Sequence, residues 1–157
     1  MTRDADSLRE DMTGAALKWE AEHGGLNMWI YEQDTGRLLK SSGVLVAIGY
    51  AGGNGGQNPE GVNNHAMQNV KNVGPLPVGY YTFGEVVLKS HLGPFAIPLL
   101  PDSDNQMFGR SAFYMHGDKV DPPRSASEGC IIMPRAVRDE CYTSKDRILR
   151  VVFSKEY

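Results

Sequence analysis

The chain has 157 residues, 41% of them apolar and 22% charged, and a formal net charge of −3 at pH 7. This composition is typical of one globular domain and excludes a disordered or low-complexity chain. A weakly acidic chain without a basic stripe is expected to bind nucleic acid or an anionic membrane surface poorly. The two cysteines are too few for a disulfide framework, and with the four histidines they lack the spacing of a zinc site.

Residues 1–25 are predicted to form an N-terminal helical segment. Ser7 and Glu10 have the spacing of a capping box, and Gly24 follows the end of the helical pattern. Five apolar residues between them share one helical face: Leu8, Met12, Ala15, Ala16 and Trp19. The segment either packs on the domain or is a docking appendage. It lacks the apolar stretch of a signal peptide, and no run of 18 apolar residues occurs, so we expect synthesis in the cytoplasm and no membrane span.

Residues 26–157 are predicted to form the main domain, which we expect to be mostly β, as a sandwich or mixed sheet, with one short C-terminal helix. The predicted strands are 28–31, 37–40, 44–48, 79–83, 85–88, 95–100, 112–115, 130–133 and 147–153. Gly84 is expected to kink one strand, and Pro98 is expected to place another at a sheet edge. Pro134 suits the first turn of a helix that runs to about Tyr142.

The segment 49–74 differs from the rest, because it contains seven glycines and six asparagines. Its glycines do not match a phosphate-binding loop. A long structureless loop in a compact domain is usually functional or disordered, so this is either a mobile surface loop or the lining of a ligand groove. In the second interpretation Tyr50, Asn63 and Asn64 contact a peptide ligand, and the loop orders when the ligand binds.

His116 and Cys130 each lie where an apolar strand meets a polar loop, 14 positions apart. If the two strands are neighbours, the imidazole can activate the thiol as a nucleophile. Gly129 lets the chain turn tightly before Cys130, and the backbone N–H groups there, with the Ser127 hydroxyl, can face a developing oxyanion. Because Gly117 has no side chain, a third group that orients His116 at that position can only be a backbone carbonyl.

The remaining cysteine and histidines have simpler explanations. A lone cysteine is most often a small buried apolar residue, and Cys141 fits this because it shares a helical face with Val137. His23 lies at the expected end of a helix. His65 and His91 have no nucleophile nearby in the sequence, so we interpret them as loop residues.

His116-Gly117 followed by Ser127-Glu128-Gly129-Cys130-Ile131 resembles the signature of the L,D-transpeptidase catalytic domain. Residues 27–153, with the run 74–81 and Gly109-Arg110-Ser111, are similar to the compact branch found among type VI secretion effectors that attack peptidoglycan. The resemblance implies an L,D-transpeptidase-like fold, Cys130 as the nucleophile and His116 as its general base. It also implies that the Gly117 carbonyl holds the imidazole tautomer, that the Gly129 and Cys130 N–H groups form the oxyanion hole, and that no metal or organic cofactor is needed.

The same resemblance implies a substrate and a place of action. The family attacks the bond between the L-centre of a diamino acid, usually diaminopimelate, and the terminal D-Ala of a tetrapeptide stem. Water, a free D-amino acid or a second stem then resolves the thioester. A secreted antibacterial effector of this kind would act in the periplasm after delivery, and its partners would be stem peptides, an immunity protein and a component of the secretion machine.

Two positions depart from the family pattern. Glu128 stands where a histidine is common, and Ile132 stands where an arginine is common. A carboxylate pointing at the thiol would raise its pKa, so we expect Glu128 to face solvent or pair with Arg124. Arg110 is then the best remaining cation for a stem carboxylate, with a surface ion pair as the alternative.

Other functions remain to be weighed. A papain-like peptidase would place its cysteine before its histidine, which is the reverse of the order here. A catalytically silent peptidoglycan-binding or immunity-type module would not need both residues. The sequence is compatible with a secreted toxin, a phage-type lysis factor or a housekeeping enzyme.

Overall fold

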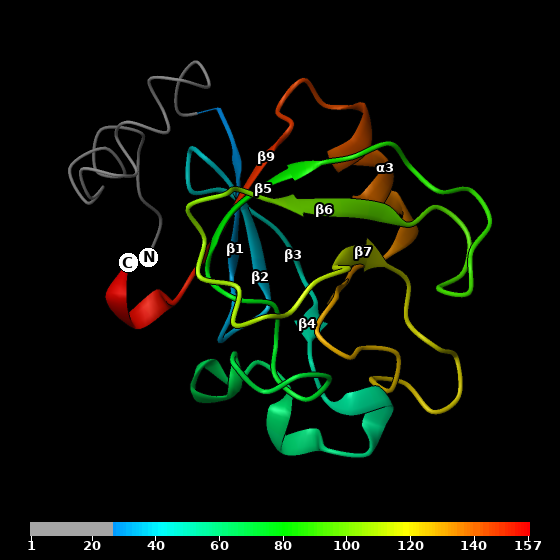
Figure 1. Ribbon diagram of the computed structural model, residues 1–157. Helices are drawn as coiled ribbons and strands as arrows, with labels where there is room; N and C mark the ends of the chain where they lie inside the picture. The colour runs from blue at the N-terminus through cyan, green and yellow to red at the C-terminus, as the bar shows by residue number, and fades with distance from the viewer. Residues whose placement is uncertain (1–26) are drawn as a thin grey trace.

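The computed structural model describes residues 27–157, and the expected helical segment 1–25 lies outside them (Figure 1). Nine strands form one sheet in the order β3-β2-β1-β9-β5-β6-β7-β8-β4. They are β1 (Trp29–Glu32), β2 (Arg37–Lys40), β3 (Leu45–Ile48), β4 (Tyr50–Ala51), β5 (Gly79–Phe83), β6 (Ile97–Pro101), β7 (Tyr114–His116), β8 (Ile131–Ile132) and β9 (Ile148–Val152). The described chain has one α-helix, α3 (Arg135–Thr143). The prediction of a mostly β fold with one short C-terminal helix is therefore confirmed.

Two predicted strands differ from those observed. Residues 85–88 form no strand, and only an isolated bridge joins Val87 to Ala96. β6 is an interior strand, paired with both β5 and β7, although Pro98 predicted an edge. The ladder with β5 ends at the pair Phe83–Leu99, so the N–H that Pro98 lacks leaves no gap in that ladder.

The alternation of side chains along the strands shows which face of the sheet carries the main hydrophobic core. Tyr31, Leu38, Tyr81 and Leu149 are fully buried in the main hydrophobic cluster, which also includes the odd-numbered residues of β7 and β8. The intervening residues of β7 and β8 therefore point to the opposite face of the sheet. That face carries His116 and Cys130.

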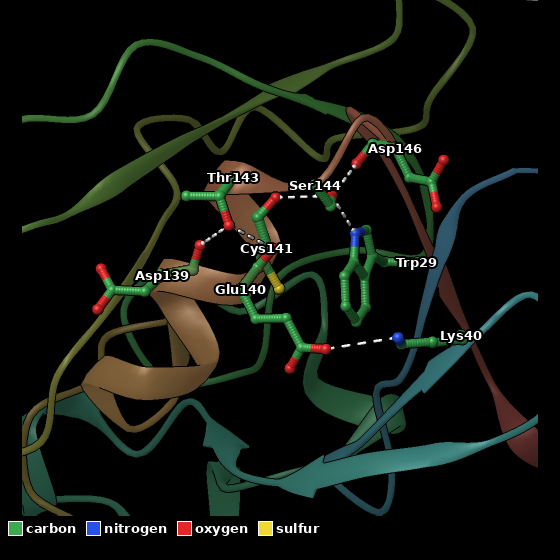
Figure 2. Close-up of polar contacts among 8 residues, drawn as sticks. All are labelled: Trp29, Lys40, Asp139, Glu140, Cys141, Thr143, Ser144 and Asp146. Carbon is green, nitrogen blue, oxygen red and sulfur yellow. Dashed lines mark hydrogen bonds and ion pairs between the residues drawn. The ribbon is translucent and has the colours of Figure 1, made fainter.

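Helix α3 is held against the sheet at its C-terminal end (Figure 2). The Ser144 hydroxyl donates to the Cys141 carbonyl at 2.9 Å and accepts from the Trp29 indole N–H at 3.1 Å. Lys40 of β2 forms an ion pair with Glu140 at 3.4 Å. Cys141 is fully buried in the main cluster beside Trp29, and both cysteines are free thiols. Cys141 is therefore a core residue, as its helical spacing predicted.

Residues 49–74 are not structureless. They contain three 3-10 turns, η1 (Asn54–Gly56), η2 (Pro59–Gly61) and η3 (His65–Met67), which lie below β4 in Figure 1. His65 stacks on the Phe153 ring with centroids 3.9 Å apart, and its Nδ1 forms a hydrogen bond with Gln33. Through His65 the segment is thus packed on the residue that follows β1 and on the C-terminal end of the chain.

Candidate active site

The strands that carry His116 and Cys130 are neighbours, as expected, but they run parallel. The register pairs Met115 with Ile131 and His116 with Ile132. Cys130 therefore lies opposite Tyr114, two positions from His116 and about 7 Å from it along the strand direction. Both residues alternate onto the same face of the sheet, so their backbone positions are diagonal neighbours across the two strands.

His116 is held in one tautomer. Its ring is 2% exposed, and Nδ1 lies 2.9 Å from the Gly117 carbonyl oxygen. A carbonyl can only accept, so Nδ1 carries the hydrogen and Nε2 of the neutral ring offers a lone pair. Nε2 is buried and has no hydrogen-bond partner among residues 27–157. An unpaired buried nitrogen is costly, which makes it a candidate for a chemical role.

The surroundings keep His116 neutral. Burial lowers the pKa of its imidazole, and the nearby positive charges of Arg138 and His91 lower it further. The hydrogen bond to Gly117 and the Asp118 carboxylate oppose this. The net shift is downward, so at neutral pH the ring can accept a proton.

Cys130 is also buried, and its thiol is protonated at neutral pH. Burial raises the pKa of the thiol to about 11, and the carboxylate of Glu128 contributes in the same direction. The Tyr114 N–H, which donates to Sγ at 3.3 Å, opposes the shift. Glu128 itself is exposed, as expected. The thiol donates to the Ala112 carbonyl at 4.0 Å. The substrate-free site therefore holds a neutral thiol and a neutral imidazole, rather than a thiolate–imidazolium pair.

Ser127 shapes the turn before the nucleophile. Its buried hydroxyl donates to the Cys130 carbonyl at 2.7 Å and accepts from the N–H groups of Gly129 at 3.0 Å and Gly52 at 2.8 Å. The expected contribution of Ser127 and of the Gly129 N–H to an oxyanion hole is not supported, because these groups already bond to each other. The Cys130 N–H is the remaining expected donor.

One comparison with known proteins identifies the family of this chain. The family model described as the Tlde1 domain matches residues 53–153, well over half of the chain and including both His116 and Cys130. The chain belongs to the Tlde1 domain family. This is a family of L,D-transpeptidase-like type VI secretion effectors that act on the cell wall. No curated protein and no solved structure matched the chain.

Arg110, which lies inside the Tlde1 match, is a structural residue rather than the expected carboxylate-binding cation. It is 6% exposed, and its guanidinium donates to four backbone carbonyls. These belong to Gln68, Gly74, Pro75 and Glu128, at 2.6–3.3 Å. The side chain therefore ties the end of the 49–74 segment to the turn before Cys130, which leaves little of it to bind a ligand.

Tyr50 holds the loop that connects β7 and β8 in place. Its hydroxyl donates to Asp118 at 2.6 Å and accepts from the Ala126 N–H at 3.0 Å. The Arg124 guanidinium lies 4.8 Å from the centre of its ring. With one donor and one acceptor engaged, the hydroxyl holds the loop in place, although the ring still lines a surface hollow beside the site.

The side chains of Asn63 and Asn64 are engaged within the 49–74 segment. The Asn63 carbonyl oxygen accepts from the Ala51 N–H of β4 at 3.1 Å. Asn64 caps η3 by accepting from the Ala66 N–H at 3.1 Å, and it donates to the Glu60 carbonyl. Both therefore stabilise the segment in the substrate-free protein, Asn63 through its carbonyl oxygen and Asn64 through both ends of its amide.

Sequence reasoning missed three residues of this site. Tyr114 supplies the N–H that meets Cys130. His91, interpreted as a loop residue, lies in the β5–β6 connection, where its charge acts on His116. Arg138 of α3 approaches Gly117 so closely that a side chain there would lie 3.1 Å from its Nη2. No local motif marks these residues, because only the fold brings them to His116.

Within residues 27–157 no helix is long and apolar enough to cross a membrane. The same residues contain no group of three or more histidine, cysteine, aspartate or glutamate side chains placed to hold a metal ion.

Proposed function

We propose that this protein is a cysteine-dependent enzyme that modifies peptidoglycan stem peptides. Its substrate is the tetrapeptide stem, and it cleaves the bond between the diamino acid and the terminal D-Ala. The products are those of an L,D-carboxypeptidase, of D-amino acid exchange, or of both. Membership of the Tlde1 domain family supports action on the cell wall.

The single observation that carries the proposal is the unpaired Nε2 of His116. A structural histidine at this depth would be expected to bond through both nitrogens. Here one nitrogen is fixed by Gly117 and the other has no partner, and alternation along β7 places His116 on the same face of the sheet as Cys130. A neutral imidazole whose Nε2 lone pair is unpaired can act as a general base.

The geometry supports the following first step. As Cys130 Sγ attacks the carbonyl carbon of the scissile amide, its proton passes to Nε2 of His116. The carbonyl oxygen becomes an oxyanion near the Cys130 N–H. The amide C–N bond then breaks, the imidazolium returns the proton to the departing nitrogen of D-Ala, and a thioester remains on Cys130.

The second step regenerates the thiol. Neutral His116 takes a proton from the acceptor, which is water or the amine of a D-amino acid or of a second stem. The acceptor attacks the thioester, and the thiolate leaves and regains the proton from the imidazolium. Water yields a tripeptide, and a D-amino acid yields an exchanged tetrapeptide.

The raised pKa of the thiol requires proton transfer to accompany attack. A preformed thiolate is rare at neutral pH in the substrate-free site, because burial and Glu128 raise the pKa of Cys130. A neutral imidazole is abundant, because burial lowers the pKa of His116. The pair therefore works as nucleophile and general base, and not as a resting ion pair.

Membership of the family supports a proposed place of action. We propose that the protein reaches the periplasm of a target cell through a type VI secretion machine, with an immunity protein as its partner in the producing cell.

Purified muropeptide tetrapeptides and mass spectrometry provide the test. The parent protein should convert tetrapeptides to tripeptides, or to exchanged tetrapeptides when a D-amino acid is added. Cys130→Ala should abolish both reactions while the melting temperature stays within a few degrees. Cys141→Ala is the matched control, because it removes the other buried thiol and should retain turnover despite some loss of stability.

Full activity of Cys130→Ala would overturn the proposal. So would a parent protein that binds tetrapeptides but leaves them intact, because this would indicate a silent binding module.

A further inference from the structure

A surface hollow of about 410 Å³ lies beside the proposed catalytic histidine. Gly117, whose carbonyl fixes the His116 ring, forms part of its lining, together with Tyr50, Ile132 and the N-terminal turn of α3. Three arginines also line it, Arg124, Arg135 and Arg138, whereas Asp118 is its one acidic residue. The charge of the lining is therefore positive in a protein whose net charge is −3.

The acidic residue is already engaged. The Asp118 carboxylate accepts hydrogen bonds from the Tyr50 hydroxyl and from the Lys119 and Arg124 N–H groups. Arg135 is paired with Asp139 at 3.1 Å on the surface of α3. These partners leave Arg138 and the Arg124 side chain as the cations of the hollow that are not neutralised by an ion pair within residues 27–157.

Arg138 is an unusual residue, because it is a cation that is 94% buried. It is 6% exposed, and no carboxylate lies within ion-pair distance of it in the described chain. Nη1 donates to the Pro94 and Phe95 carbonyls at 3.3 and 3.2 Å, and Nε is buried without a partner. Nη2 points at Gly117. The Asp139 carboxylate and the two carbonyls compensate this charge only in part, because burial and Arg135 still lower the pKa of Arg138. Burying such a charge is costly, so a ligand that compensates the rest is expected.

Ile132 lines the same hollow and is 4% exposed. It occupies the position, two residues after Cys130, where the L,D-transpeptidase pattern commonly has arginine. The register places Ile132 directly opposite His116 on β7. β8 therefore lacks the arginine of the family pattern, and Arg138 of α3 lines the same hollow as Ile132.

We propose that this hollow is a carboxylate-binding subsite and that Arg138 is its principal donor. A carboxylate there accepts from Nη2 of Arg138, and Arg124 at the exposed rim contributes long-range attraction. The proposal rests on the proposed function, because it assumes a peptide substrate bound across His116. Its occupant is either the side-chain carboxylate of the diamino acid or the terminal carboxylate of D-Ala.

Binding to Cys130→Ala protein, measured by calorimetry, separates these two sources without turnover. The probes are a synthetic diaminopimelate tetrapeptide, the same peptide amidated at the diaminopimelate side-chain carboxylate, and the peptide amidated at the terminal D-Ala. Protein with Arg138 intact should bind the free peptide about tenfold to a hundredfold more tightly than one of the amidated peptides. The amidation that weakens binding identifies the carboxylate that occupies the subsite.

Arg138→Met, in the same background, should abolish this preference. Arg147→Met is the matched control, since Arg147 also donates to backbone carbonyls beside α3, those of Tyr142 and Phe83, but does not line the hollow. It should keep the preference. The double variant Ile132→Arg/Arg138→Met should regain the preference, because it moves the cation to the opposite wall of the same space.

Three results would overturn the subsite. The first is that the protein binds all three peptides with equal affinity, or binds none of them measurably. The second is that the Arg138 and Arg147 variants lose the preference for the free peptide equally. The third is that the folded double variant does not recover this preference. Turnover by protein with Cys130 intact is measured separately with unmodified stems. A lack of turnover there overturns the proposed function, whereas turnover with equal affinity for the three peptides overturns the subsite alone.

Discussion

The Ser127 hydroxyl lies 2.7 Å from the Cys130 carbonyl oxygen and donates to it across the turn that precedes the nucleophile. The Ser127 hydroxyl oxygen itself accepts from the Gly129 and Gly52 N–H groups. One buried hydroxyl therefore fixes the turn internally and also ties it to the end of β4. Its contribution is to position Cys130, and it need not touch the substrate.

Ser127→Ala should lower both stability and turnover. It removes one donor and leaves two buried N–H groups without an acceptor, so the free energy of unfolding should fall by roughly 2–4 kcal/mol. Turnover of tetrapeptides should fall at least about tenfold, because small displacements of a nucleophile are costly. Ser125→Ala is the control. Ser125 is buried in the same loop but makes one bond, to Pro122, so its loss should cost about 1 kcal/mol.

Gly129→Ala should be more damaging than an ordinary glycine substitution. Gly129 has φ +138°, and an added Cβ would lie 2.7 Å from both Nη2 of Arg110 and the Phe113 ring. We expect a loss of more than about 3 kcal/mol in urea unfolding. Gly109→Ala is the matched control, because Gly109 also has a positive φ, +71°, but its Cβ would meet nothing within 4 Å. It should lose only about 1–2 kcal/mol, and equal losses would contradict the clash.

The reactivity of Cys130 should depend on pH in a way that reflects its burial. In the substrate-free protein, the rate of alkylation by iodoacetamide should keep rising up to a pKa of about 11, with no plateau near neutrality. Glu128→Gln should lower that pKa and raise the rate at pH 8, because it removes a carboxylate that disfavours the thiolate. The Cys141→Ala background ensures that only Cys130 is followed. A plateau below pH 7 would contradict the neutral-thiol state.

In the pH profile of turnover, the decrease on the acid side should lie below pH 6.5. The base form of His116 is required, and burial together with Arg138 and His91 holds the pKa of His116 below its ordinary value of 6.5. A group with a lowered pKa loses its proton earlier as pH rises, so activity should already be near its maximum at pH 7 with respect to this group. His91→Ala should move this decrease to higher pH, because it removes a positive charge. A decrease at unchanged pH would exclude that electrostatic contribution.

His65→Ala tests whether residues 49–74 are packed. Loss of the stack on Phe153 and of the bond to Gln33 should lower the free energy of unfolding by about 1–2 kcal/mol. The control is His91→Ala, since His91 is exposed and should change stability by less than about 0.5 kcal/mol. Equal stability of the two variants would instead favour the mobile loop that the glycine and asparagine content predicted.

Local patterns in the sequence were sufficient for several features of the fold. Short apolar and aromatic runs between turn residues predicted β1, β2, β5 and β9 to within one or two residues, and Pro134 predicted the start of α3. Cys141 was predicted as a core residue from its spacing to Val137. These features depend on residues that are close together in the chain, so composition and periodicity determine them.

The sequence by itself also predicted the pairing of His116 with Cys130, from their places at boundaries between strand and loop and from the resemblance to the L,D-transpeptidase signature. The tertiary structure alone decided that their strands run parallel, that Arg110 and Ser127 are engaged by the protein's own backbone, and that Arg138 reaches Gly117. The physical reason is that a buried polar group takes whichever partner the fold presents. For Arg110 that partner is the carbonyl of Gln68, 42 positions earlier in the chain, and no local pattern specifies such a distant contact.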